Sequence, residues 1–428
     1  MSELQPKELT RRKFLKTAGV GLVAASAVGD MIQPAVAQQP TPLPPKIKLP
    51  PLMAPTEKES GGPPRALPPN KRLGFAIVGL GTLALEEILP AFAETKRCKP
   101  VALVSGSQNK AAEIAQQYGI NPKNIYNYQN YDSIRNNPEV DVIYIVLPNS
   151  MHAEYTIRGA QGGKHILCEK PMATSPQECQ QMIDACNKAN KKLMVAYRIQ
   201  YEPYNRAMMQ MVRSKELGAV RMIEADNGQN QGGDLNQWRL KKALAGGGCL
   251  PDVGIYCLNT SRFLTGEEPI EISAMMYSTP GDPRFQEVEE NISFMMRFPS
   301  GILANCSASY GYHEARRYRV FGADAWAELD PAFSYTGLQM HMAHKSRANS
   351  MAETVENRRM EQKNQFALEM DHMAECVIEN KQPYTPGEEG LQDQKLMAVI
   401  YEAARTGKTI KLPAVSGLDV TRGSKPTS

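Results

Sequence analysis

Three side chains that could move a proton occur at two separate places in the chain. Lys170 follows an apolar segment, 165–168, and its neighbour Pro171 restricts it to an extended backbone. Asp252 and Tyr256 are four residues apart, a spacing that puts both on one face of a helix. A neighbouring ammonium lowers the pKa of a phenol from about 10, so Tyr256 could exchange a proton with a substrate hydroxyl. Asp252 could orient Tyr256 or bind the substrate.

The same residues also have ordinary structural explanations. A lysine before a turn is most often a surface residue. An aspartate in the first turn of a helix is favoured by the helix dipole alone, and a tyrosine one turn later could pack in the core. The spacing of Asp252 and Tyr256 favours neither interpretation, so the elements that would bring them to Lys170 decide between the two.

A fingerprint of dinucleotide binding follows the first strong strand pattern. The apolar run 73–78 predicts a buried strand, a Gly-x-Gly turn comes directly after it, and apolar residues at helical spacing follow Ala84. In this context the first glycine permits a tight turn, the second lets the backbone approach a pyrophosphate, and Ala84 lets the helix pack on the strand. The start of the helix offers unpaired N–H groups to phosphates. The expected cofactor contacts of this turn are Gly79, Gly81, Thr82 and Leu83.

The end of the next strand indicates which dinucleotide binds. In NAD enzymes an Asp or Glu closes this strand and holds the ribose 2′-hydroxyl. Here the strand expected at 100–104 is followed by Ser105, Gly106 and Ser107, and then by Lys110. These residues offer hydroxyls and an ammonium to a 2′-phosphate, and no carboxylate to repel it. We therefore expect NADP, although Ser105 and Lys110 could also merely begin the next helix.

The first half of the chain alternates strands and helices. Six strands in this alternation indicate a doubly wound parallel sheet of Rossmann type, which we assign to residues 71–200. Ligands of such sheets bind beyond the carboxyl ends of the strands. Those ends carry Leu147-Pro148-Asn149, Glu169-Lys170-Pro171 and Tyr197-Arg198. After the first two strands, the others are expected at 125–128, 140–147, 165–168 and 192–197, with helices at 152–162 and 175–190.

The second half has a different pattern. From about Gly218 the strands become longer and often alternate apolar and polar residues, and Pro299-Ser300-Gly301 is typical of a hairpin turn. We therefore expect residues 201–428 to form an α+β domain with an open, mostly antiparallel sheet. A helix is expected near 252–264, and two more, at 366–378 and 391–404, are expected to return to the Rossmann domain. The expected strands are 220–226, 270–277, 291–298, 303–309 and 318–321.

The first 70 residues precede the expected fold. The run Thr10-Arg11-Arg12-Lys13-Phe14-Leu15-Lys16 stands before a weakly hydrophobic segment, and Ala35-Val36-Ala37 fits an A-x-A cleavage site. This pattern resembles a twin-arginine (Tat) export signal over 1–37 and predicts a periplasmic protein that uses the Tat machinery. An amphipathic first helix or a membrane anchor is the alternative, which three glycines and Asp30 in the segment disfavour. Residues 38–70 hold 11 of the 31 prolines and predict an extended arm, either a linker or a segment that docks on a partner subunit.

Composition restricts the partners. The 428 residues, 42% hydrophobic and 22% charged, suit a globular protein of two domains. A net charge of +4 without a basic run beyond the export signal gives nucleic-acid binding no support. The eight cysteines form no CxxC or Cys/His cluster, so no metal is expected. An even number permits disulfides in an exported protein, but a chain of this size does not need them, and we expect free buried thiols.

Three motifs together resemble those of the Gfo/Idh/MocA oxidoreductases: Gly79-Leu80-Gly81, Cys168-Glu169-Lys170-Pro171 and Asp252-x-x-x-Tyr256. Many members of that family carry histidine where Tyr256 stands. The tyrosine, with Ser105-Gly106 and Lys110, is similar to the periplasmic glucose–fructose oxidoreductase branch and its NADP site. The resemblance runs from the signal to the Glu-Ala-Ala-Arg-Thr-Gly segment at 402–407, nearly the whole chain.

By position, the resemblance implies that Tyr256 is the acid/base, that Lys170 assists it and that Asp252 supports it. It also implies a homodimer or homotetramer formed through the C-terminal sheet and the N-terminal arm. The implied cofactor contacts, besides those of the glycine turn, Ser105, Gly106 and Lys110, are Leu147, Pro148, Asn149, His152, Glu169, Lys170, Arg198, Trp238, Arg239 and Tyr335.

The resemblance further implies ping-pong chemistry on NADP that stays bound. Tyr256, as phenolate, would take the C1 hydroxyl proton of a glucose-like aldose as hydride passes to NADP, and a lactone would leave. A fructose-like ketose or a second aldose would then take up hydride and proton and leave as an alditol. Three alternatives remain: an exported NAD-dependent glycosidase, a non-catalytic sugar- or nucleotide-binding protein, and a dehydrogenase with exchangeable cofactor. The glycosidase is disfavoured by Ser105, Lys110 and Tyr256. The binding protein is disfavoured by the intact set of Lys170, Asp252 and Tyr256, and the dehydrogenase with exchangeable cofactor is disfavoured by export.

Overall fold

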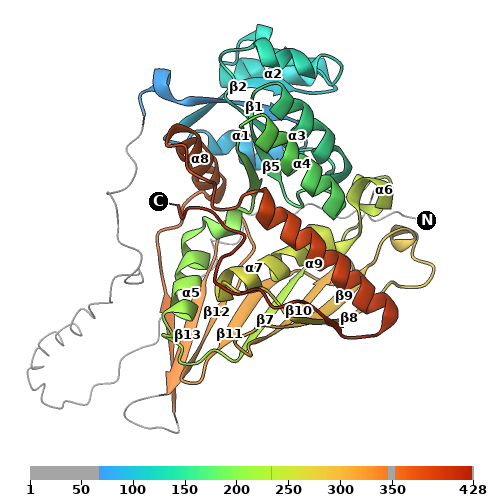
Figure 1. Ribbon diagram of the computed structural model, residues 1–428, viewed down its shortest axis with the longest axis vertical. Coiled ribbons are helices and arrows are strands. Elements are labelled where there is room, and N and C mark those ends of the chain that lie inside the picture. The colour runs from blue at the N-terminus through green and yellow to red at the C-terminus, as the bar shows by residue number, and fades with distance from the viewer. Residues whose placement is uncertain (1–66, 233, 346–351, 427–428) are drawn as a thin grey trace, which may run out of the picture. The chain divides into compact units, whose positions relative to one another are not determined.

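The computed structural model describes residues 67–232, 234–345 and 352–426 (Figure 1). The export signal expected at 1–37 and the part of the arm before residue 67 lie outside these ranges, so both stay predictions. The described residues all belong to one compact unit, 50–428.

The first sheet is parallel and has six strands in the order β3-β2-β1-β4-β5-β6. This confirms the predicted doubly wound fold. The order reverses between β1 and β4, and ligands of such sheets bind at this switch point, outside the carboxyl ends of the strands. The strands are β1 (Leu73–Val78), β2 (Cys98–Val104), β3 (Ile125–Tyr126), β4 (Val142–Ile145), β5 (His165–Glu169) and β6 (Leu193–Ala196).

Helices alternate with these strands, and α2, α3 and α4 pack on the sheet. The bounds are α1 (Leu89–Ala91), α2 (Gln108–Tyr118), α3 (His152–Gln161) and α4 (Pro176–Lys188). The first of them departs from the expected regular helix, because a π-helical turn, Ala84–Ile88, precedes α1. Pro90 has no N–H and cannot make the usual i→i−4 bond, and the wider turn closes instead through the bond from the Leu89 N–H to the Ala84 carbonyl.

The second sheet has nine strands in the order β14-β13-β12-β11-β7-β10-β9-β8-β15. All neighbours pair antiparallel except β7 and β10, and the hairpin predicted at 299–301 joins β9 to β10. The strands β12, β13 and β14 were not expected from the sequence; β14 is almost wholly exposed, so its residues carry no apolar alternation. The strands are β7 (Met222–Gly228), β8 (Glu271–Tyr277), β9 (Asn291–Arg297), β10 (Leu303–Ser309), β11 (Ala315–Phe321), β12 (Ala325–Leu329), β13 (Met340–Lys345), β14 (Glu353–Arg358) and β15 (Ile410–Lys411).

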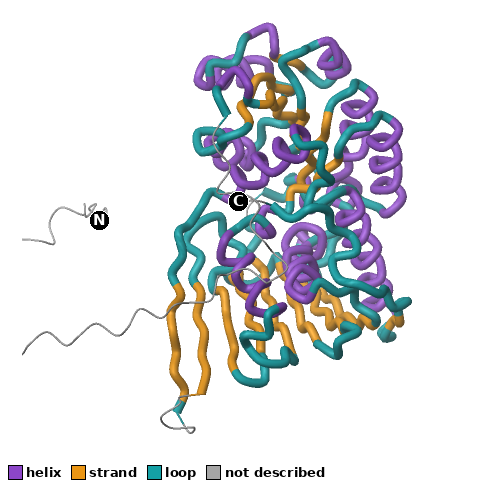
Figure 2. Tube along the Cα trace, turned by 60° about the vertical axis from the view of Figure 1, so that its left-hand side comes forward, coloured by secondary structure: helices purple, strands orange, loops and turns teal. Residues whose placement is uncertain are grey.

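Helices lie on one side of the large sheet and also join it to the small one. Figure 1 shows α5, α7 and α9 in front of the large sheet, and Figure 2 shows the two groups of strands apart, one in the upper and one in the lower half of the molecule. The helix α8 packs on β2 and β5, and α9 packs on α4, so the C-terminal helices return to the first sheet. The bounds are α5 (Pro203–Arg213), α6 (Lys242–Ala245), α7 (Ile255–Thr265), α8 (Gln365–Ile378) and α9 (Gly387–Thr406), with a π-helical turn η8 (Leu250–Gly254) before α7.

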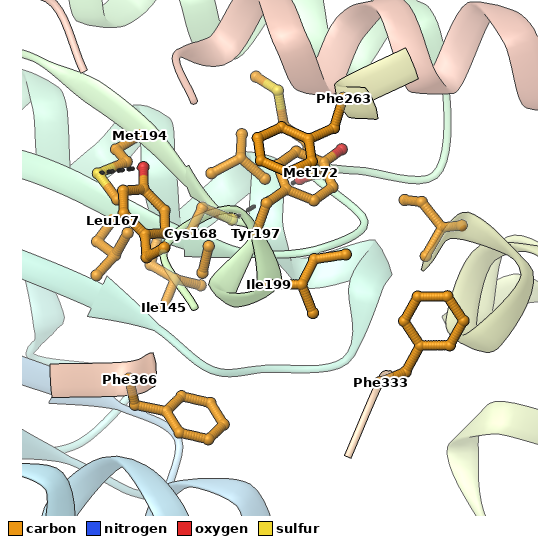
Figure 3. Packing of buried hydrophobic residues seen from close by; sticks show 14 of the residues in the cluster. Ile145, Leu167, Cys168, Met172, Met194, Tyr197, Ile199, Phe263, Phe333 and Phe366 are labelled. Carbon is orange, nitrogen blue, oxygen red and sulfur yellow. Dashed lines mark hydrogen bonds between the residues drawn. The ribbon is translucent and has the colours of Figure 1, made fainter. Parts of the chain in front are cut away.

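An apolar core underlies the carboxyl ends of β4, β5 and β6. Figure 3 shows Ile145, Leu167 and Met194 from these strands, and Phe333 and Phe366 come from the second half of the chain. All eight cysteines are buried and free, as predicted. Among the described residues, no helix has the length and apolar character needed to cross a membrane, and no group of His, Cys, Asp or Glu is arranged to hold a metal.

Candidate active site

The glycine turn after β1 has the shape that a dinucleotide requires. Gly79 has a φ of +97°, and a Cβ there would lie 2.2 Å from the carbonyl oxygen of Val146, so no larger residue fits. A Cβ on Gly81 would meet nothing within 4 Å, so the space above this residue is open. The helix begins directly after it and presents its first N–H groups there. The residues present therefore fit a pyrophosphate.

The segment after β2 carries the groups expected to select the nucleotide. The Ser105 hydroxyl accepts a hydrogen bond from the Ser107 N–H at 3.1 Å, and the Ser107 hydroxyl caps α2. Lys110 is exposed and its ammonium donates to the carbonyl of Leu80 in the glycine turn at 3.3 Å. One ammonium and one exposed hydroxyl thus stand at the rim of the turn, where a 2′-phosphate would find donors.

The structure brings Lys170, Asp252 and Tyr256 together. Lys170, directly after β5, donates from its Nζ to the Asp252 carbonyl at 2.6 Å and lies 3.3 Å from the Asp252 Oδ1. The same Nζ lies 4.8 Å from the centre of the Tyr256 ring. Asp252 comes from η8 and Tyr256 from the first turn of α7. The two motifs, 82 residues apart between Lys170 and Asp252, therefore form one cluster.

Asp252 has three partners that hold its charge. Its Oδ2 accepts from Arg239 Nε at 3.1 Å and from the Tyr310 hydroxyl at 2.7 Å, and its Oδ1 faces Lys170. Burial alone would raise the pKa of Asp252, but the charges of Arg239 and Lys170 outweigh it and hold that pKa well below its usual range. The carboxylate thus binds these residues rather than the Tyr256 hydroxyl, and any effect of Asp252 on Tyr256 passes through Lys170.

Two cations flank Tyr256. The Arg198 guanidinium carbon lies 5.0 Å from the ring centre, and the Lys170 ammonium lies 4.8 Å from it. Arg198 is buried and fixed by hydrogen bonds to the Phe333 carbonyl and the Gln365 side chain. Burial would lower the pKa of Lys170, but Tyr256 and Asp252 raise it, so the lysine stays charged. The phenol expected to carry the proton therefore sits in a positive environment.

These residues line a cavity of about 150 Å³ at the carboxyl ends of the first sheet. Leu83 from the glycine turn and Tyr335 line the same cavity, so the expected phosphate and nicotinamide ends of the site are continuous. Two larger hollows, each about 700 Å³, lie on the open face of the large sheet and beside α9, and contain none of the predicted site residues.

Several predicted cofactor contacts lie behind the cavity wall. His152 is fully buried, and its two ring nitrogens lie 2.8 Å from the Leu147 carbonyl and 2.9 Å from the Pro171 carbonyl. It thereby joins the turn of Leu147, Pro148 and Asn149 to the turn after β5. The Asn149 side chain donates to the Ala245 carbonyl in α6 at 2.8 Å. These side chains position the strand-end turns that surround the cavity.

Two more predicted residues line the cavity beside the cluster. Arg239, predicted as a cofactor contact, binds Asp252 and stacks on Trp238 with 4.6 Å between its guanidinium carbon and the ring centre. Tyr335 stacks on Arg198 at 4.6 Å. Both are partly exposed, so they can reach a bound ligand.

Sequence reasoning missed Tyr310, Asn227, Gln229 and Arg316, which complete the site. Tyr310 follows β10 directly, and Asn227 and Gln229 stand at the end of β7. Because β7 and β10 are parallel neighbours, their carboxyl ends meet at one edge of the large sheet. Polar residues at both strand ends were the available signal, but the pairing of these two strands could not be read from the sequence.

Known proteins resemble both halves of the chain. A family model described as "Oxidoreductase family, NAD-binding Rossmann fold" matches residues 73–197, and one described as "GFO/IDH/MocA C-terminal domain" matches residues 205–328. The D-xylose 1-dehydrogenase [NADP(+)] of Haloarcula marismortui is 30% identical over 343 residues, 79% of this chain and 92% of that protein.

Solved structures are also similar. An aldose-aldose oxidoreductase from Caulobacter crescentus, complexed with glycerol, is 44% identical, has a TM-score of 0.76 and is matched over 80% of this chain and 100% of its own. A levoglucosan dehydrogenase in complex with NADH and levoglucosan has a TM-score of 0.70 at 20% identity, over 80% of this chain and 100% of its own, which shows a common fold.

Proposed function

Because the chain belongs to the Gfo/Idh/MocA family of oxidoreductases, we propose that it is a sugar oxidoreductase that holds NADP and transfers hydride from one sugar to another. The observation that carries this proposal is the Tyr256 side chain between the charges of Lys170 and Arg198, in the cavity beyond β5. The oxidation of a hydroxyl needs a proton acceptor within reach of the substrate, and Tyr256 lines this cavity beside Lys170.

NADP is the proposed cofactor. Ser105, Ser107 and Lys110 offer donors at the position of the ribose, and the xylose dehydrogenase relative is named for NADP(+). The bound nicotinamide supplies the chemistry of accepting hydride from one substrate and returning it to another. The glycine turn would hold the pyrophosphate, and the turns after β4 and β5 would surround the reactive half of the cofactor.

The protein's own residues handle the proton. Tyr256, as phenolate, accepts the proton of the C1 hydroxyl of a glucose-like cyclic aldose as the C1 hydrogen leaves as hydride, and the sugar departs as a lactone. Lys170 donates to the substrate oxygen and, through its bonds to Asp252, keeps a fixed position beside Tyr256. The second sugar, a fructose-like ketose or another aldose, receives the same proton from Tyr256 at its carbonyl oxygen and leaves as an alditol. This order is a ping-pong mechanism.

The proposed location is the periplasm, and the proposed assembly is a homodimer or homotetramer. The Tat-like signal supports export of a protein already folded around its cofactor, and a cofactor regenerated in place needs no periplasmic supply. The open face of the large sheet supports the assembly, because β8 and β9 expose Met275, Tyr277 and Met295, with 78%, 60% and 57% of their surface accessible.

The substitution Tyr256→Phe tests the proposed role of the phenol. The variant keeps the ring between Lys170 and Arg198 but cannot exchange a proton, so we expect sugar oxidation to fall by about 10²–10⁴ while the purified protein keeps its NADP. The measurement is the rate of nicotinamide reduction by an aldose, with nucleotide content determined after denaturation. Unchanged turnover would exclude Tyr256 as the acid/base.

A further inference from the structure

Two carboxyl groups and a phenol form a buried chain behind the cavity, and the mechanism above does not use it. The hydroxyl of Tyr144, in β4, lies 2.7 Å from Oε1 of Glu169 and 3.0 Å from Oε1 of Glu369, which comes from α8. Tyr144 and Glu369 are fully buried, and Glu169 is 7% exposed because it lines the cavity.

The two contacts of Tyr144 require an additional proton. A phenol has one proton and can donate it to only one carboxyl group. If both glutamates were ionised, the second contact would set an oxygen lone pair of Tyr144 against a buried anion without a hydrogen between them, which is costly. One protonated carboxyl group satisfies both contacts, because its O–H donates to the phenol oxygen while the phenol donates onward.

The surroundings indicate which glutamate holds the proton. Burial raises the pKa of Glu169, but its hydrogen bond with Tyr144 and the charges of Lys170 and Arg198 oppose that rise and favour its ionised form. The groups that face Glu369 are Tyr144, Glu169 and Arg198, and its Oε2 has no hydrogen-bond partner among the described residues. Burial and the charge of Glu169 raise the pKa of Glu369 well above its usual range.

We propose that Glu369 stays protonated and, through Tyr144, holds Glu169 as the single ionised carboxylate in this wall of the cofactor cavity. One anion there, between Lys170 and Arg198, leaves both cations beside Tyr256. A second anion would draw Arg198 toward α8 and away from the phenol. Glu369 and Tyr144 are therefore positioning residues. Their effect on hydride transfer rests on the proposed function, whereas the protonation of Glu369 does not.

Protein stability measured against pH tests the protonation directly. Glu369→Gln keeps the shape of a protonated glutamic acid and its N–H can donate to Tyr144. In the unfolded wild type, Glu369 releases its proton above the ordinary pKa of 4.5, whereas the folded protein keeps that proton. The free energy of unfolding therefore falls as the pH rises from 4.5 toward the pKa of Glu369 in the folded state. The variant has no such loss. We expect the ratio of the unfolding equilibrium constants, variant over wild type, to fall about tenfold for each pH unit between these two pKa values.

The matched control is Glu375→Gln, on the same helix. Glu375 is 3% exposed and pairs with Lys381 at 3.5 Å. Its replacement removes a buried carboxyl group from the same helix without touching the contacts of Tyr144, so it should give no such gain with pH. The proposal would be overturned if the free energies of unfolding of Glu369→Gln and the wild type differed by the same amount at every pH. It would also be overturned if the variant were less stable than the wild type over the whole pH range.

The loaded protein gives a second readout. Above the pH at which Glu369 ionises, the wild type should lose rate in the first half-reaction. Glu369→Gln cannot ionise at this position, so this loss should be absent from its pH profile, with little change in KM. Tyr144→Phe breaks the chain and should lower kcat across the whole pH range. Identical pH profiles for wild type and Glu369→Gln would contradict the positioning role. A purified protein with no nucleotide would instead count against the proposed function, and the unfolding titration would still report on Glu369.

Discussion

Replacing Asp252 by Asn removes the charge that holds the catalytic cluster together. The carboxylate meets Lys170 at 3.3 Å, Arg239 at 3.1 Å and the Tyr310 hydroxyl at 2.7 Å. Asparagine has the same shape, but it carries no charge and its amide nitrogen would face a cation or the phenol. Asp252→Asn therefore leaves two positive groups without their counter-ion in a largely buried site.

The structure sets the size of the effect. Removing one partner of a buried ion pair costs about 3–5 kcal/mol. The side chains of Asp252 and Lys170 are 16% and 13% exposed, so this range applies to their pair. The Arg239 side chain is 37% exposed, so water can solvate its guanidinium and compensate part of the lost ion pair with Asp252. We therefore expect Asp252→Asn to lower the free energy of unfolding by about 3 kcal/mol at neutral pH.

The pH dependence has a definite sign. The folded state depresses the pKa of Asp252 below its ordinary 3.8, so the stabilisation is present above pH 3.8 and is lost as the pH falls through the folded value. The difference between wild type and variant should therefore narrow in acid. Urea unfolding followed by circular dichroism measures it. Asp226→Asn is the matched control, because Asp226 pairs with Arg317 at half-exposed positions and should cost below about 1 kcal/mol. Equal losses in the two variants would refute the buried role of Asp252.

Two further substitutions test the cofactor turn and the support of α7. Lys110→Ala removes the ammonium expected at the 2′-phosphate, and a hydrogen bond to a charged group contributes about 1.5–3 kcal/mol. NADP should therefore bind about 10- to 100-fold more weakly, and the affinity for NAD should change little. Equal losses of affinity for both nucleotides in a fluorescence titration would contradict this. Glu289 accepts from two backbone N–H groups at the start of η8 and from the Tyr401 hydroxyl. Glu289→Gln replaces one acceptor oxygen by a donor, and the lost hydrogen bond costs about 1–3 kcal/mol in the turn that holds Asp252. We therefore expect kcat to fall by about tenfold in this variant and to stay unchanged in the control Glu290→Gln. Equal kcat values in the two variants would show that this contact does not position the site.

Local patterns were enough to predict the first sheet. Its strands are buried on both faces, so each reads as a continuous apolar run, and the Gly79 turn needs no distant partner. The strands β13 and β14 carry no such signal, although each pairs with its neighbour along the chain. β14 is almost wholly exposed, and only three residues of β13 are buried. The π-helical turn before α1 follows from Pro90, which was visible, but a proline predicts only a disturbed helix.

The part of the site that local sequence patterns encode was predicted, and the part that depends on contacts between distant segments was not. Lys170, Asp252 and Tyr256 belong to short motifs, and the structure brings them together. Tyr310 reaches Asp252 only because β10 pairs with β7, a contact between segments some eighty residues apart. Glu369 lies in a helix that also carries Asp371 and Glu375, so the sequence alone gives no reason to choose it as the residue beside Glu169.

Transfer of hydride between two sugars on a nucleotide that stays bound is tested most directly with the purified protein and no added cofactor. Glucose is added while the near-ultraviolet absorbance of reduced nicotinamide is followed, and fructose or a second aldose is added afterwards. We predict a rise equivalent to one nucleotide per chain that the second sugar reverses. A protein that releases no nucleotide on denaturation, or one whose bound nucleotide no aldose reduces, would contradict it.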